Sequence, residues 1–171
     1  YMANMDDFIG DPTKFKENLK DAFDKGYHFE WIAKAQMLLE TLLKSYLYIA
    51  VNGNYSIRKF RDNEQADWAK KLSFYHTLNM LYILSLLPDA LFDDLKKANS
   101  RRNLIMHNLI MKNENLEPLD LEKHYDLCSK TIERLSNELV KYTHFQKISM
   151  ESVNKVMKEL EERKEKNNEA T

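Results

Sequence analysis

The sequence predicts an all-α protein, a single helical bundle of five to six helices. Only three glycines and three prolines occur among 171 residues, which is too few for the many tight turns of a sandwich or barrel built from short strands. Charged residues make up 31% of the chain and are mostly Lys and Glu, which favour solvated helix faces. Hydrophobic residues make up 43%, enough to close one core without disulfides or metals.

Apolar residues spaced three or four positions apart predict the first three helices. The first begins at Pro12 and ends near Gly26, a residue type common at helix ends. The second covers 28–51 and ends at the Asn-Gly-Asn turn that follows. The third covers 63–87, and its part that is apolar almost all round, 78–84, is expected to be buried on more than one side, by the core or by a second subunit.

Two further helices follow a proline. Pro88 separates the third helix from a fourth, which reaches Leu109. The pair Asn99-Ser100 offers a cap inside this fourth helix, so a kink or a restart is expected there. The fifth helix starts at Asp120 and keeps a four-three apolar spacing as far as Tyr142, the seam of a long bundle helix.

The chain shows no internal repeat and no linker long enough to separate two domains. We therefore expect one domain, a bundle over 12–145 with a separate C-terminal helix and polar tail over 149–171. The single cysteine, Cys128, cannot form an intrachain disulfide, which favours the reducing cytoplasm. No apolar run is long enough to span a bilayer, and Asp6 and Asp7 stand where a signal peptide would carry positive charge. We expect no membrane association.

One short element combines residue types that suit phosphodiester cleavage: Arg102, Asn103 and, after three apolar positions, His107. Arginine can stabilise charge that develops on a phosphate, and histidine, which titrates near neutral pH, can move the proton of a ribose 2′-hydroxyl. On a continuous helix, Arg102 and His107 differ in direction by about 140°. Either the helix is irregular there or another chain completes the site. Because the net charge is −1, RNA binding must come from a local patch.

Arg102, Asn103 and His107 resemble the motif of the HEPN family (higher eukaryote and prokaryote nucleotide-binding), in which Arg, a polar residue, a short spacer and His lie on a late helix of an all-α bundle. An early amphipathic helix that contains Glu40 also looks family-like, and the resemblance covers 12–145. It implies a metal-independent endoribonuclease, a hydrolase without a cofactor, whose active site brings together the motifs of two chains in a homodimer. Many such enzymes are toxins or phage-defence effectors, which implies RNA and an antitoxin or regulatory protein as partners.

The resemblance assigns His107 as general acid or base, Arg102 as the group that stabilises charge on the phosphate, and Asn103 as the polar member of the motif. Glu40 is expected either to orient His107 or Arg102 or to be a rim residue. A basic strip beside the motif is expected to contact RNA, unless it is only a solvated face; it consists of Lys96, Lys97, Arg101 and Lys112.

Three alternatives stay open. Arg102 and His107 could have purely structural roles, the chain could be a non-catalytic HEPN-like module that binds a nucleotide or a protein, or it could be a helical adaptor. Leu109 stands where a variant of the family that is paired with a nucleotidyltransferase antitoxin has Tyr, which argues against control by tyrosine modification. The remaining histidines show no close ligand spacing with Cys or acidic residues, so no metal site is expected; they are His28, His76, His124 and His144.

Overall fold

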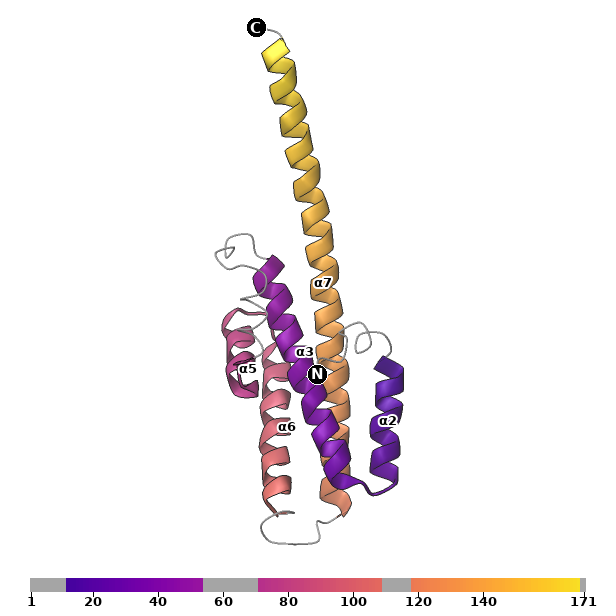
Figure 1. The fold of residues 1–171 in the computed structure, drawn as a ribbon. Coiled ribbons are helices and arrows are strands. Elements are labelled where there is room, and N and C mark those ends of the chain that lie inside the picture. Colours follow the sequence, from indigo (N-terminus) through magenta and orange to yellow (C-terminus); the bar gives the residue numbers. More distant parts are fainter. Residues whose placement is uncertain (1–11, 54–70, 109–117, 170–171) are drawn as a thin grey trace.

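A computed structural model describes residues 12–53, 71–108 and 118–169, and these parts contain five helices and no strand. The helices are α2 (Pro12–Asp24), α3 (His28–Gly53), α5 (Phe74–Ile83), α6 (Asp89–His107) and α7 (Pro118–Glu169). Figure 1 shows them as a bundle from which the C-terminal part of α7 projects. The predicted all-α bundle is confirmed. None of these helices is both long and apolar enough to cross a membrane.

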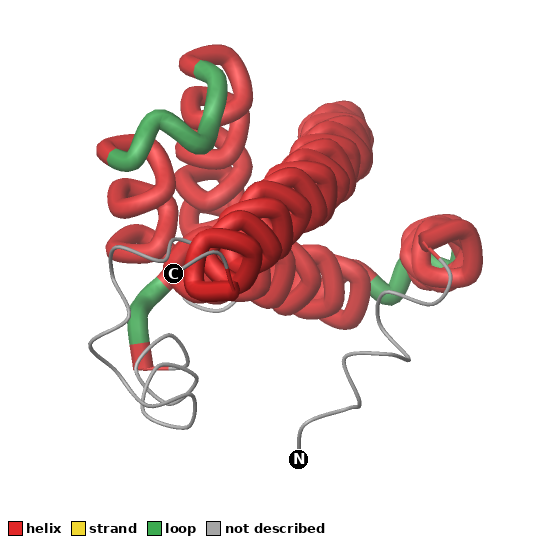
Figure 2. Tube along the Cα trace, turned by 90° about the horizontal axis from the view of Figure 1, so that it is seen from above, coloured by secondary structure: helices red, strands yellow, loops and turns green. Residues whose placement is uncertain are grey.

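Helix α3 is the centre of the bundle, because it packs against each of the other four helices. Figure 2, which looks down the bundle, shows α2 on one side of α7 and the pair α5 and α6 on the other. Large side chains from α3, α5, α6 and α7 are almost fully buried; they include Trp31, Leu39, Leu43, Leu47, Leu78, Leu81, Leu91, Leu95 and Leu135. Helix α2 joins this core through the ring of Phe23, which stacks on Tyr125 of α7 with centroids 4.5 Å apart.

The turn between α2 and α3 agrees with the sequence prediction. Gly26 has a φ of +74°, a left-handed conformation that glycine adopts without a steric cost. Its N–H donates to the carbonyl of Phe23, and the N–H of Tyr27 donates to that of Ala22, both at 2.9 Å. These bonds satisfy carbonyls at the end of α2 and reverse the chain into α3.

The predicted bounds of the third helix, 63–87, are wrong within the described residues. Helix α5 begins only at Phe74, because Ser73 caps it by accepting a hydrogen bond from the N–H of His76 at 3.3 Å, and 54–70 lie outside the described residues. The prediction that 78–84 is buried on more than one side is not met by this chain alone. Leu78 and Leu81 face the core, whereas Ile83 is 79% exposed.

The turn after α5 places a serine in a conformation that favours glycine. Ser85 has a φ of 56°, and the N–H groups of Leu84 and Leu86 donate to the carbonyls of Met80 and Leu81, both at 3.0 Å. We expect Ser85→Gly to raise the free energy of unfolding by about 0.5–1 kcal/mol, because relief of the left-handed conformation outweighs the extra chain entropy of glycine. Urea denaturation measures the change. Ser100→Gly, within α6, should lower stability instead, and a loss of stability in Ser85→Gly would contradict the prediction.

Two predicted helix breaks do not occur. Helix α6 runs without interruption through Asn99-Ser100, because the Asn99 side chain accepts a hydrogen bond from the Gln36 amide of α3 at 3.5 Å instead of capping its own backbone. Helix α7 likewise continues through Ser149 to Glu169. No glycine or proline follows Pro118, and a helix lacking both has no local reason to stop. The predicted separate C-terminal helix is therefore the projecting end of α7.

Candidate active site

The three motif residues lie in the last turns of α6. His107 is the last residue of this helix, and Asn108, which caps it, keeps a helical backbone and donates to the carbonyls of Leu104 and Ile105. The backbone is α-helical from Arg102 to His107, and only Asn108, which follows, is π-helical, so no irregularity between Arg102 and His107 brings them onto one face. Leu109 and Lys112 lie outside the described residues.

A hydrogen bond directs Arg102 toward the side of α6 that carries His107. Arg102 is half-buried, and its Nη1 donates to Oδ1 of Asn103 at 2.8 Å. Asn103 and His107 are four residues apart and both are exposed, so they occupy the same face of the helix. Among the residues that the structure describes, no carboxylate lies within ion-pair distance of Arg102. The positive charge of Arg102 is therefore not neutralised by any described neighbour.

Exposed polar side chains form one line along α6, which we call the α6 ridge. It consists of Lys96, Ser100, Asn103 and His107, spaced four, three and four residues apart and all exposed. Lys96 also lies over the Phe92 ring, with Nζ 5.2 Å from the centroid. Of the predicted RNA contacts, Lys96 thus shares a face of α6 with Asn103 and His107. Lys97 is exposed beside this ridge.

Arg101 lies on a different side of α6 from the ridge. Its Nη2 contacts Oδ1 of Asp120, near the start of α7, at 3.4 Å. An exposed pair at this distance contributes little to stability, but it keeps the guanidinium at the contact between α6 and α7. Among the predicted RNA contacts, Arg101 is therefore separated from Lys96 and the motif.

Glu40 shares a groove with Arg102 without bonding to it. The groove lies between α3 and α6, has a volume of about 440 Å³, and is lined by Ala33, Gln36, Met37, Glu40, Thr41, Lys44 and Arg102. We call it the α3–α6 groove. Glu40 Oε1 pairs with Lys44 Nζ at 2.7 Å. Within the described residues, Glu40 makes no direct contact with His107, so the side chain that it orients is Lys44.

The sequence prediction overlooked a contact between His124 and Cys128. These residues are four apart on α7, and the Cys128 Sγ lies 3.8 Å from Nδ1 and 3.7 Å from Nε2 of the His124 ring. The four-residue spacing on a predicted helix was the signal that could have found this pair. No group of three or more His, Cys, Asp or Glu side chains in the described parts could hold a metal ion.

Burial keeps both members of this pair uncharged. His124 is only 1% exposed and packs against Trp31, with ring centroids 5.4 Å apart. Burial, reinforced by the positive charge of Arg101, lowers the pKa of His124 to about 4. Burial also raises the pKa of the Cys128 thiol to about 12, against the opposing effect of Arg101. A neutral imidazole beside a protonated thiol is a structural pair, since the thiolate is the reactive form of cysteine.

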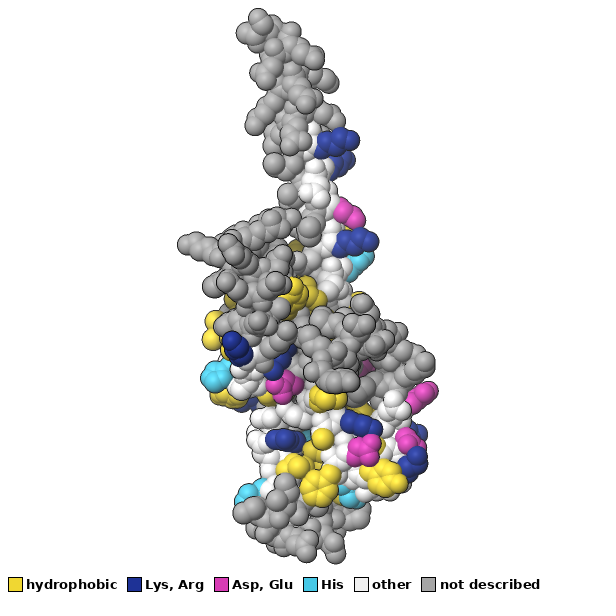
Figure 3. Space-filling view, viewed as in Figure 1, with side chains coloured by type: hydrophobic (Ala, Val, Ile, Leu, Met, Phe, Trp, Pro, Cys, Tyr) yellow, Lys and Arg dark blue, Asp and Glu magenta, His cyan; other side chains and the backbone are white. Residues whose placement is uncertain are grey.

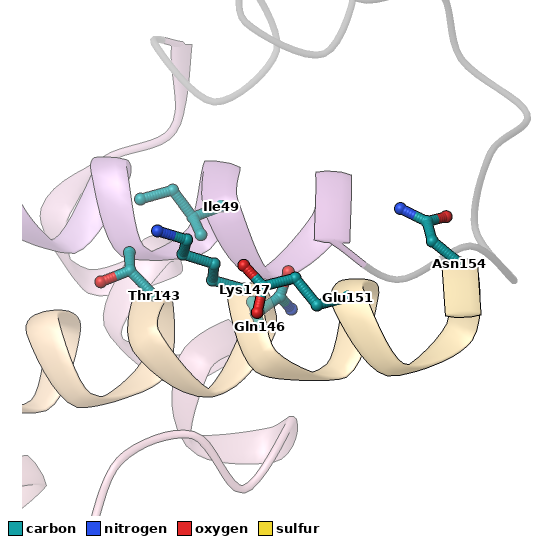
Figure 4. A pocket seen from close by; sticks show the side chains of 6 residues that line it. All are labelled: Ile49, Thr143, Gln146, Lys147, Glu151 and Asn154. Carbon is teal, nitrogen blue, oxygen red and sulfur yellow. The ribbon is translucent and has the colours of Figure 1, made fainter. Parts of the chain in front are cut away.

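A second groove lies between α3 and α7, toward the end of the bundle from which α7 projects (Figures 1 and 4). It has a volume of about 430 Å³ and is lined by Ile49, Thr143, Gln146, Lys147, Glu151 and Asn154. None of these belongs to the predicted site. Figure 3 shows a face of the molecule on which the described Lys and Arg side chains alternate with Asp and Glu, so the described residues of this face form no extended basic patch.

Comparisons with models of protein families, with curated proteins and with solved structures give no significant match to this chain. Its function must therefore be inferred from its own residues. The C-terminal end of α6 carries the half-buried Arg102, whose charge no described carboxylate neutralises, together with the exposed Asn103 and His107.

Proposed function

We propose that the protein is a metal-independent endoribonuclease of the HEPN type, active as a homodimer. The observation that carries the proposal is the hydrogen bond from Arg102 to Asn103, on the exposed face of α6 that also bears His107. This bond turns the guanidinium of Arg102 toward the surface that carries His107, the candidate general acid or base. We further propose the cytoplasm as its compartment, because the one cysteine, Cys128, is unpaired and buried.

The proposed reaction is transfer of the phosphodiester to the neighbouring 2′-oxygen. His107 accepts the proton of the ribose 2′-hydroxyl, and the 2′-oxygen then forms a bond to phosphorus. Arg102 stabilises the additional negative charge on the phosphate oxygens, which is the role that a guanidinium fork performs best. The bond from phosphorus to the 5′-oxygen breaks, and this oxygen takes a proton from the second chain's histidine or from water. The products are a 2′,3′-cyclic phosphate and a 5′-hydroxyl.

Two chains are proposed because one regular helix separates its Arg102 and His107 by about 140°. The hydrogen bond to Asn103 turns the Arg102 guanidinium toward the side of His107, but the two side chains still leave the helix in different directions. Leu104, which lies beside the ridge, is 62% exposed, and a second copy placed on this face would cover it. In this arrangement the arginine of one chain serves the histidine of the other.

Complementation between inactive variants tests the shared site. Arg102→Ala and His107→Ala should each cut RNA far more slowly than the wild type. When the two are co-expressed, about half of randomly paired symmetric dimers carry one variant of each kind. Such dimers keep one Arg102 and one His107 on different chains, so we expect RNA cleavage well above that of either variant alone. Light scattering checks that all the samples are dimers.

The outcomes separate the alternatives. Recovery in the mixed sample, with 2′,3′-cyclic phosphate ends and no effect of EDTA, supports the proposed mechanism. A mixture no more active than its parts would contradict a site shared between chains. A wild type that binds RNA without cutting it would identify a non-catalytic binding module. If the protein is a toxin or a defence effector, an antitoxin or regulatory protein that covers the α6 ridge would restrain it.

A further inference from the structure

We infer that the α3–α6 groove binds the backbone of single-stranded RNA at a nucleotide that flanks the cleaved bond, with a phosphate beside Lys44 and Arg102. This inference rests on the proposed function, because it places the groove next to the site of cleavage. It adds a binding surface on α3, a helix that the motif does not include.

Arg102 connects the groove to the motif. Its Nη1 donates to Asn103 on the α6 ridge, while the same side chain lines the groove together with residues of α3. The distance between the two surfaces is therefore no more than the length of one arginine side chain. Its Nε is buried without a hydrogen-bond partner, an unfavourable state for a charged group. An acceptor oxygen that enters the groove, with a small rotation of the side chain, would satisfy it.

The charges and polar groups of the groove suit a phosphodiester. Among the described residues that line the groove, Arg102 and Lys44 carry positive charges and Glu40 carries the one negative charge. The Gln36 amide donates one N–H to Asn99 and keeps a second that can donate to a phosphate or ribose oxygen. The Thr41 hydroxyl donates to the carbonyl of Met37 at 2.8 Å, so its oxygen can accept a hydrogen bond from a ribose hydroxyl. The excess of positive charge among the described residues of the groove favours an anion there, although the protein as a whole has a net charge of −1.

The apolar part of the lining favours an unpaired nucleotide. Met37 is 52% exposed, and with Ala33 it forms an apolar surface on α3 within the groove. A methionine side chain packs readily against a flat aromatic surface such as a nucleobase. Only a base that is not paired in a duplex can lie on such a surface, so single-stranded RNA is the expected ligand.

Helix α3 offers matched variants for a test. Lys44 pairs with Glu40 at 2.7 Å and Lys34 pairs with Glu30 at 2.5 Å, both four residues apart, but only the first pair lines the groove. Each replacement removes one positive charge from α3 and an ion pair with the glutamate four residues earlier. A difference in RNA affinity between the two variants therefore measures the contribution of the groove to binding and not a change in the stability of α3.

The experiment measures binding of a fluorescent single-stranded RNA in which every ribose carries a 2′-O-methyl group, so that it cannot be cut. We expect Lys44→Ala to weaken binding about fivefold and to reduce the slope of log K against log salt concentration by about 0.7, the loss of one phosphate contact. Lys34→Ala should bind as the wild type does. Glu40→Gln should bind more tightly, because it removes the negative charge from the groove, whereas Glu30→Gln should have no effect.

Equal binding by Lys44→Ala and Lys34→Ala would overturn the inference, as would a wild type that does not bind the probe. Its failure can be told apart from failure of the proposed function. If RNA is cleaved in a His107-dependent way but Lys44 makes no difference to binding, only the groove inference is wrong. If binding depends on Lys44 but no RNA is cleaved, the groove binds RNA and the proposed ribonuclease activity is wrong.

Discussion

Replacing His107 with alanine is expected to lower the rate of RNA cleavage by about 10²–10⁴-fold, the contribution of a positioned general acid or base. The substitution should leave the fold intact. His107 is exposed at the end of α6, and its ring makes no hydrogen bond to the described residues, so its removal neither empties the core nor leaves a buried group unpaired. The loss should therefore appear in the rate of cleavage and not in the free energy of unfolding.

The measurement compares single-turnover cleavage of a labelled RNA by the two proteins, with unfolding in urea as the check on stability. His144→Ala is the control, because His144 is also exposed but lies on α7, away from the motif. Arg102→Lys sharpens the assignment, since lysine keeps the charge but lacks the planar fork and should stay strongly impaired. Cleavage by His107→Ala at the rate of the wild type would contradict the proposed role.

Acidification from pH 8 to pH 5 is expected to destabilise the protein by about 2 kcal/mol through His124 alone. Burial lowers the pKa of this histidine to about 4 in the folded state, whereas an unfolded histidine titrates near pH 6.5. Between these values the unfolded chain binds a proton that the folded chain does not. Stability therefore falls as the pH drops through this window, and it is unaffected by His124 above about pH 7.5.

Urea denaturation at pH 8, 6 and 5 measures this effect. His124→Gln, which keeps a polar side chain but cannot titrate, should lose most of the pH dependence, and His144→Gln should retain it. Because a substitution in the core can itself weaken folding, the wild type gives a second measurement. The NMR signal of the His124 ring should not titrate until about pH 4, and a midpoint near 6.5 would show the assignment to be wrong.

The sequence predicted the class of the fold and the position of the motif on a helix. Both follow from local information, namely the spacing of apolar residues and the scarcity of glycine and proline. The same local information located Gly26, whose positive φ ends α2. The local pattern gave a wrong prediction at Asn99. Asparagine caps helices in many proteins, but here its side chain accepts a hydrogen bond from Gln36 of another helix.

The direction and environment of individual side chains depended on contacts between helices. Arg101, predicted as a member of the basic strip, lies against Asp120 of α7. In the sequence, His124 was considered only as a possible metal ligand, but in the structure it is buried against Trp31 of α3. Residues far apart in the chain create these environments, so no spacing rule along one helix reveals them.

By itself, then, the sequence determined that the chain forms helices, where most of them begin and end, and that Arg102, Asn103 and His107 share one helix. Only the tertiary structure decided that Glu40 and Lys44 of α3 line one groove with Arg102 of α6. Periodicity within one helix specifies which residues share a face. The packing of the helices against one another decides which charges, hydrogen-bond partners and apolar surfaces lie against that face.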